Sequence, residues 1–180
     1  MLRTRFVVIT GMIVLAAVSR LLPHPPNFTP IAALALFGGA YLADRRLAFL
    51  VPLAAMFASD LVLGLHRLMP VVYGCFAVMV CVGGWLRTRR RVLPVAGATL
   101  AGSILFFVST NFGVWAVGTL YPKTVQGLIE CYGAAIPFFR NTFLGDAFYA
   151  AVLFGGMALA ERCFPVLSGA REVVQPRSRS

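Results

Sequence analysis

Acidic residues and histidines are scarce in this sequence. Its 180 residues include six Asp or Glu and two His, and only 12% of all residues are charged. There is no metal-ligand set such as His-x-x-x-His and no Ser/His pair, and the two histidines, His24 and His66, fall in connectors between apolar runs. We therefore expect no catalytic residues and no metal site or cofactor.

The four cysteines show no Cys-x-x-Cys spacing, and three of them lie inside apolar sequence. This pattern is typical of small buried hydrophobic side chains and argues against a disulfide framework.

Apolar residues, in contrast, are abundant. They make up 59% of the chain, and the mean hydropathy is +0.84. A soluble domain of this length could not bury so much apolar surface, which predicts an integral membrane protein. At about 20 residues per span, the length allows about six spans. We expect an all-α fold, with a transmembrane domain over residues 1–167 and a disordered cytoplasmic tail over residues 168–180.

The apolar runs predict a bundle of six transmembrane helices with an irregular outer loop between helices 5 and 6. A cleaved signal peptide is an alternative for the first run, because it contains the small-x-small triplet Ala17-Val18-Ser19. Four prolines between residues 23 and 30 predict an extended connector, after which Thr29 can cap the second helix. The expected helices are Phe6–Leu22, Ile31–Ala43, Leu47–Leu65, Met69–Leu86, Leu93–Phe107 and Thr142–Ala160.

The distribution of basic residues predicts the orientation of these spans. With the amino terminus inside, twelve of the sixteen Lys and Arg fall in inner segments and four in outer ones. This positive-inside bias predicts that both termini are cytoplasmic. The net charge of +10 therefore reports topology, and we expect the lipid bilayer and no nucleic acid as partner.

The segment from Ser109 to Asp146 concentrates polar and aromatic residues between two apolar runs. We expect it to be largely irregular, with Gly127–Phe138 as a short re-entrant or surface helix that acts as a lid. With this orientation, most intramembrane polar groups converge at the outer side, which predicts a ligand pocket. The candidate ligand-binding residues are Asn27, Thr29, Asp60, Tyr73, Asn111, Trp115, Phe138, Arg140, Asn141 and Asp146.

Roles for some of these side chains follow from their chemistry. Trp115 and Phe138 would stack on a ring of the ligand, while Arg140 and the two carboxylates would orient it. The alternative is structural, because Asp60 and Asp146 can form interfacial ion pairs with nearby arginines. The available arginines are Arg20, Arg67 and Arg140.

Three segments resemble the substrate-binding S components of energy-coupling factor transporters. They are Asn27–Ala40, Leu50–Gly64 and Ala134–Gly156, which contain a Pro-led second helix, an Asp-x-x-x-Gly ending and a Pro/Asn-led last helix. The resemblance implies capture of a small nutrient, a vitamin or its precursor, at the outer face of a bacterial inner membrane. It also implies an energy-coupling module made of a transmembrane coupling protein and ATPases.

One departure leaves the coupling open. S components present Ala-x-x-x-Ala on the first helix, and the first span here has no such pattern. A solitary carrier, in which Cys75 could bind cobalt, is therefore an alternative. The sequences Pro-x-Asn-Phe-Thr-Pro and Ile-Pro-Phe-Phe-Arg-Asn-Thr also resemble a family of uncharacterised bacterial membrane proteins.

Two other classes of function stay open. A structural or assembly subunit without a ligand would have mutually satisfied polar groups and no cavity. An intramembrane aspartyl protease would use Asp60 and Asp146, but Phe143-Leu144-Gly145-Asp146 lacks the Gly-x-Gly-Asp pattern.

Overall fold

The computed structural model describes residues 2–168, and within this range the chain forms helices and no strands, which confirms the all-α prediction. The expected tail lies outside the described residues from residue 169 onward. A π-helical turn, Ala151–Gly155, joins the last two α-helices. The α-helices are α1 (Leu2–Ser19), α2 (Ile31–Tyr41), α3 (Arg45–Leu63), α4 (Met69–Leu86), α5 (Val92–Val117), α6 (Val125–Ala150) and α7 (Gly156–Cys163).

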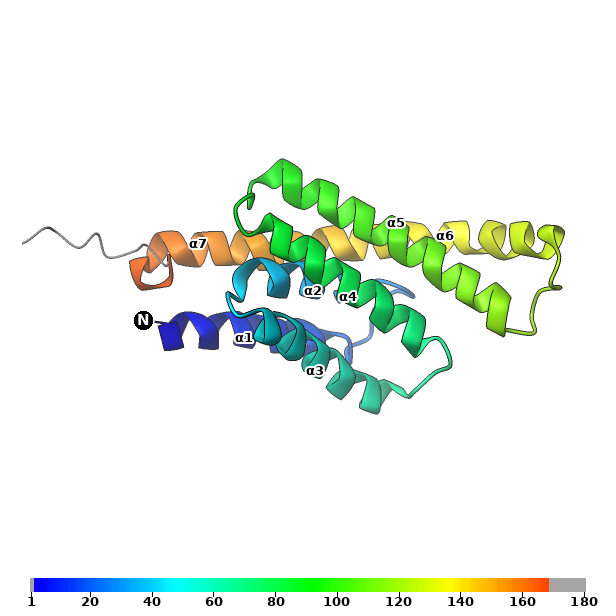
Figure 1. Ribbon diagram of the computed structural model, residues 1–180, viewed down its shortest axis with the longest axis horizontal. Helices are drawn as coiled ribbons and strands as arrows, with labels where there is room; N and C mark the ends of the chain where they lie inside the picture. Colours follow the sequence, from blue (N-terminus) through cyan, green and yellow to red (C-terminus); the bar gives the residue numbers. More distant parts are fainter. Residues whose placement is uncertain (1, 169–180) are drawn as a thin grey trace, which may run out of the picture.

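In the described part of the chain, four helical segments are long and apolar enough to cross a membrane: α3, α4, α5 and the continuous helix Val125–Cys163. These segments give the chain the character of an integral membrane protein. The helices run back and forth along the long axis of the molecule (Figure 1). We call the end that carries the connection between α5 and α6 the α5–α6 end, and the opposite one the α4–α5 end.

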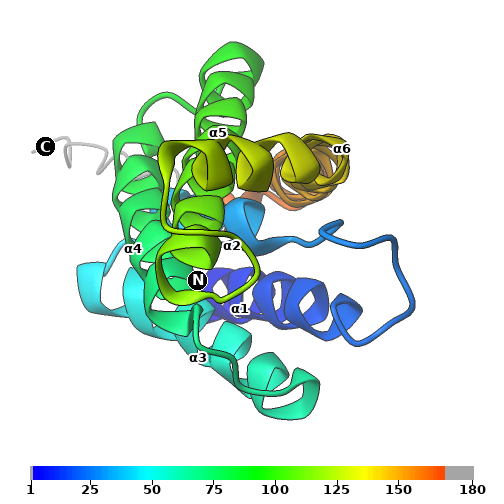
Figure 2. The ribbon, with the colours of Figure 1, turned by 90° about the vertical axis from the view of Figure 1, so that its right-hand side faces the viewer.

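Helix α2 lies at the centre of the bundle, in contact with α1, α3, α4, α5 and α6 (Figure 2). All of its residues from Ala32 to Tyr41 are buried. A Cβ added to Gly39 would lie 2.2 Å from the Val80 carbonyl oxygen, and one on Gly83 would lie 2.3 Å from the Leu36 carbonyl oxygen. The small residues of α2 therefore allow its backbone to touch that of α4.

Both α5 and α6 are longer than predicted, and the prediction of a largely irregular segment from Ser109 to Asp146 was wrong. Only residues 118–124 are non-helical, and Gly127–Phe138 forms the first half of α6 instead of a separate lid. Thr124 caps α6 by accepting a hydrogen bond from the Gly127 N–H at 3.1 Å. Pro137 lacks a backbone N–H donor but does not end the helix, and membrane helices tolerate such prolines.

The polar residues that suggested a loop are accommodated inside α5. Thr110 donates to the Phe106 carbonyl oxygen and Asn111 donates to the Phe107 carbonyl oxygen, both at 2.7 Å. Because each side chain bonds to the carbonyl oxygen four residues earlier, its donor is satisfied without interrupting the helix.

Helix α1 ends at Ser19, three residues before the predicted end at Leu22, and the connector is non-helical from Arg20 until α2 begins at Ile31. Its segment with four prolines is non-helical, as predicted. The expected capping role of Thr29 was wrong, because Pro30 occupies the N-cap position and no side-chain cap hydrogen bond forms there. Asn27 has φ of 64°, in the left-handed region that Asn tolerates better than most residues.

Candidate functional site

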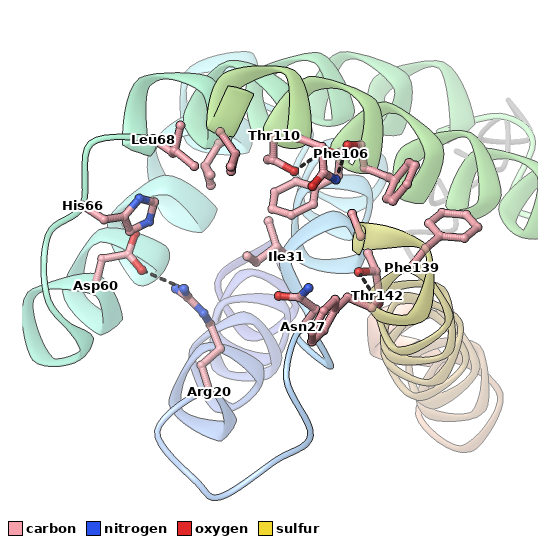
Figure 3. Close-up of a pocket in the computed structure, with 16 residues that line it drawn as sticks. Arg20, Asn27, Ile31, Asp60, His66, Leu68, Phe106, Thr110, Phe139 and Thr142 are labelled. Carbon is pink, nitrogen blue, oxygen red and sulfur yellow. Dashed lines mark hydrogen bonds and ion pairs between the residues drawn. The ribbon is translucent and has the colours of Figure 1, made fainter. Parts of the chain in front are cut away.

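A pocket of about 300 Å³ opens at the α5–α6 end, between the connector that follows α1, the last turn of α3, the start of α4 and the facing sides of α5 and α6. Figure 3 shows its side chains surrounding a common space. It is lined by Arg20, Asn27, Ile31, Asp60, His66, Leu68, Val72, Phe106, Phe107, Thr110, Asn111, Val114, Ala135, Phe138, Phe139 and Thr142.

A buried ion pair forms one wall of the pocket. The Arg20 guanidinium lies 2.7 Å from the Asp60 carboxylate, and these side chains are 9% and 5% exposed. Tyr73 donates a hydrogen bond to the second Asp60 oxygen at 2.8 Å, and Arg20 also donates to the Ser59 hydroxyl. The pair thus connects the end of α1 to α3 and α4. The Arg20 Nε is buried without a partner among the described residues.

The opposite wall offers hydrogen-bond acceptors. The hydroxyl protons of Thr110 and Thr142 and the amide of Asn111 are donated to carbonyl oxygens of their own helices. Each hydroxyl keeps its lone pairs, and the Asn111 amide keeps its oxygen. This wall therefore presents mainly acceptors to the pocket, and the second N–H of the Asn111 amide is its one remaining donor.

Aromatic rings cover the space between these walls. Phe106 and Phe107 come from α5, and Phe138 and Phe139 come from α6. The rings of Phe107 and Phe139 lie 5.0 Å apart between centroids, in a tilted arrangement. The pocket thus combines one ion pair, several acceptors and an apolar aromatic surface.

The structure brings four of the ten predicted site residues into the pocket wall: Asn27, Asp60, Asn111 and Phe138. Tyr73 lies directly behind the wall, through its hydrogen bond to Asp60. Asn141 donates to the Pro26 carbonyl oxygen at 3.1 Å and so fixes the connector that carries Asn27. Thr29, Trp115, Arg140 and Asp146 do not line the pocket.

Trp115 and Arg140 occupy positions unlike those expected. Trp115 donates to the Pro122 carbonyl oxygen at 3.0 Å, and Lys123 lies over its ring at 5.7 Å, so these residues close the turn between α5 and α6. Arg140 is exposed and forms no ion pair within residues 2–168. Six residues along a helix turn a side chain by about 120° net, so Arg140 cannot face the same side as Asp146.

Asp146 is buried away from the pocket. It accepts a hydrogen bond from the Ser103 hydroxyl at 2.7 Å. The backbone N–H groups of Ala32 and Ala33 also interact with its carboxylate. These N–H groups belong to the first turn of α2, where backbone N–H groups have no partner within their own helix. Asp146 therefore lies against the start of α2, and within residues 2–168 it forms no ion pair with Arg67 or Arg140, the alternative considered from the sequence.

Sequence reasoning missed most of the wall contributed by α5 and α6. On α6, the lining positions Ala135, Phe138, Phe139 and Thr142 follow the spacing i, i+3, i+4, i+7. This is the period of one helix face. The signal was present, but it could be recognised only if the segment was interpreted as a helix.

Comparisons with known proteins give a family and no activity. The model of DUF6580, described as a family of unknown function, matches residues 1–167. No curated protein and no solved structure matches the chain. Within residues 2–168, no group of three or more His, Cys, Asp or Glu side chains could hold a metal ion.

Proposed function

The chain belongs to DUF6580, a family of unknown function, and we propose that this protein captures a small polar molecule at the outer face of a membrane. The supporting observation is the 300 Å³ pocket beside the buried pair of Arg20 and Asp60. Its volume lies at the lower end of the range for ligand sites.

The proposed topology has six spans with both termini in the cytoplasm of a bacterium. The path of the chain supports it, since the connections after α1, α3 and α5 lie at the α5–α6 end (Figure 1). The basic connectors, including Arg45, Arg46 and the segment 87–91, lie at the α4–α5 end. Under the positive-inside rule the pocket then opens outward.

The chemistry of the walls favours a neutral or zwitterionic ligand. Arg20 and Asp60 balance each other, and no other Asp, Glu, Lys or Arg of residues 2–168 lines the pocket. The acceptors on α5 and α6 suit a ligand with amine, amide or hydroxyl donors. The phenylalanine rings suit a planar or apolar portion, as found in many vitamins and their precursors.

We propose uptake rather than catalysis as the role of this binding. The pocket contains a single carboxylate, Asp60, that is held in an ion pair, and the other candidate acid, Asp146, is not part of the pocket. A partner energy-coupling module and a solitary carrier are both compatible with this proposal. Co-purification with ATPases distinguishes the two.

The proposal can be tested by releasing bound small molecules from gently purified protein and identifying them by mass spectrometry. Ala135→Trp should fill the pocket and remove the released ligand, because Ala135 lines it. The matched control is Ala134→Trp, since Ala134 is its exposed neighbour and does not line the pocket. The control should retain the ligand. Equal ligand content in both variants, or no released ligand from the parent protein, would favour a structural role.

A further inference from the structure

A second hollow lies on the side of the bundle at the α4–α5 end. It is a groove of about 420 Å³ between the first half of α5 and the helix formed by α6, the π-helical turn and α7. Its lining residues are Arg90, Arg91, Val92, Val95, Ala96, Thr99, Phe143, Ala147, Ala150, Ala151, Phe154, Gly155 and Ala158.

The walls of this groove are two facing helix stripes. Val92, Val95, Ala96 and Thr99 are spaced i, i+3, i+4, i+7 along α5. The facing stripe consists mainly of Ala and Gly and runs from Phe143 to Ala158, about 22 Å of helix at 1.5 Å per residue. Small residues usually let helices touch, yet here the two helices leave a hollow, and a Cβ added to Gly155 would meet nothing within 4 Å.

The groove is apolar along its length and basic at one end. Apart from the arginines, its one polar side chain is Thr99, which already donates to the Val95 carbonyl oxygen at 2.9 Å. No acidic residue lines it. Arg90 lies 3.7 Å from Glu161, whereas no ion pair of Arg91 forms within residues 2–168. Arg91 is exposed and stands at the N-cap position of α5.

We propose that this groove binds one anionic phospholipid, with an acyl chain along the Ala/Gly stripe and the phosphate at Arg90 and Arg91. Charge complementarity selects this occupant, since a basic pocket between membrane helices suits an acidic lipid headgroup. The π-helical turn lies on the wall of the groove, and such turns are frequent at functional sites. This lipid site requires that the helices be inserted in a membrane. It does not require that the pocket beside Asp60 bind a ligand.

The test uses full-length protein in mild detergent, titrated with phosphatidylglycerol or with phosphatidylcholine of the same acyl chains and observed by native mass spectrometry. The parent protein should retain one phosphatidylglycerol in preference to phosphatidylcholine. Arg91→Gln should weaken phosphatidylglycerol binding about fivefold and leave phosphatidylcholine unchanged. Arg89→Gln is the charge-matched control, because Arg89 lies over the Trp85 ring and does not line the groove.

A second pair of variants tests the apolar part. Gly155→Leu should occupy the groove and lower binding of both lipids, whereas Gly97→Leu, at an open α5 position outside the groove, should not. Equal retention of both lipids by the parent protein would overturn the proposal. So would equal effects of Arg91→Gln and Arg89→Gln, or unchanged lipid binding in Gly155→Leu. The ligand content of Ala135→Trp tests only the proposed small-molecule pocket and not the lipid groove.

Discussion

The regions around Asp60 and Asp146 each contain an aspartate residue that is 3% exposed, but the two carboxylates have different neighbours. Asp60 is paired with Arg20 and lies on the wall of a pocket. Asp146 has no ion-pair partner within residues 2–168, and its carboxylate accepts a hydrogen bond from Ser103 beside the start of α2. Equal burial of the same residue type therefore says little about role, since one carboxylate lies on the wall of a pocket and the other lies outside it.

The sharpest test of this difference is to remove the charge at Asp60. Asp60→Ala leaves Arg20 buried and unpaired, which should lower the free energy of unfolding by about 3–5 kcal/mol. The double variant Arg20→Met/Asp60→Leu removes both charges and should regain most of that loss. Denaturant titration in detergent measures both effects.

Ligand content of the same double variant separates binding from stability. If the pair serves the pocket, the refolded double variant should release no ligand. Parent-like ligand content in the double variant would assign the pair a purely structural role.

Removing the carboxylate of Asp146 should have a smaller effect, and this effect should be on stability alone. Asp146→Ala removes the acceptor of the Ser103 hydrogen bond and leaves that buried hydroxyl and the nearby first α2 amides without a carboxylate, at a cost of about 2 kcal/mol in the free energy of unfolding. Ligand affinity of the folded fraction should not change. Asp146→Asn keeps an acceptor oxygen and serves as the control. A loss of ligand in folded Asp146→Ala would contradict the comparison.

Asn27 allows a finer test within the pocket region. Asn27→Gly keeps the left-handed backbone but removes the amide, so ligand affinity should fall about fivefold, the effect of one hydrogen bond, with little change in stability. Asn27→Ala should lose the same affinity and also about 1 kcal/mol of stability, because its Cβ disfavours φ of 64°. Affinity can be measured with the identified ligand, and thermal unfolding reports stability. Unchanged affinity in Asn27→Gly would remove Asn27 from the site.

The smallest effect is expected for Arg140→Ala. Arg140 is exposed and lies outside the pocket wall, so stability should change by less than about 0.5 kcal/mol and ligand content should not change. A drop in ligand content would show that Arg140 reaches the ligand after all. Thermal unfolding and ligand release from one preparation provide both measurements.

Polar residues within apolar sequence were the main source of error in predicting the fold. Thr110 and Asn111 suggested a loop, but both donate to the helix backbone four residues earlier. Pro137 likewise suggested a break, yet α6 passes through it. Composition indicates that these residues are unusual at membrane depth, whereas their hydrogen bonds depend on conformation.

The candidate site was predicted in part for a related reason. The sequence indicated that Asp60 and Asn111 approach the same end of the bundle, since alternating spans bring every second connection to one side. The sequence could not show that Asp60 lines the pocket while Asp146 and Arg140 do not. Packing decides which face of a helix points toward the neighbouring helices, and the position of a residue along the chain does not reveal this.

The sequence by itself determined that this chain is helical and suited to a membrane, because apolar runs of membrane-spanning length leave few other ways to satisfy the backbone. It also determined that α2 can pack closely, through its alanines and glycines. Only the tertiary structure decided that Arg20 pairs with Asp60 on the wall of a pocket, and that Asp146 lies outside that pocket, bonded to Ser103. Those contacts join residues from separate helices, and their geometry depends on how the helices rotate and cross.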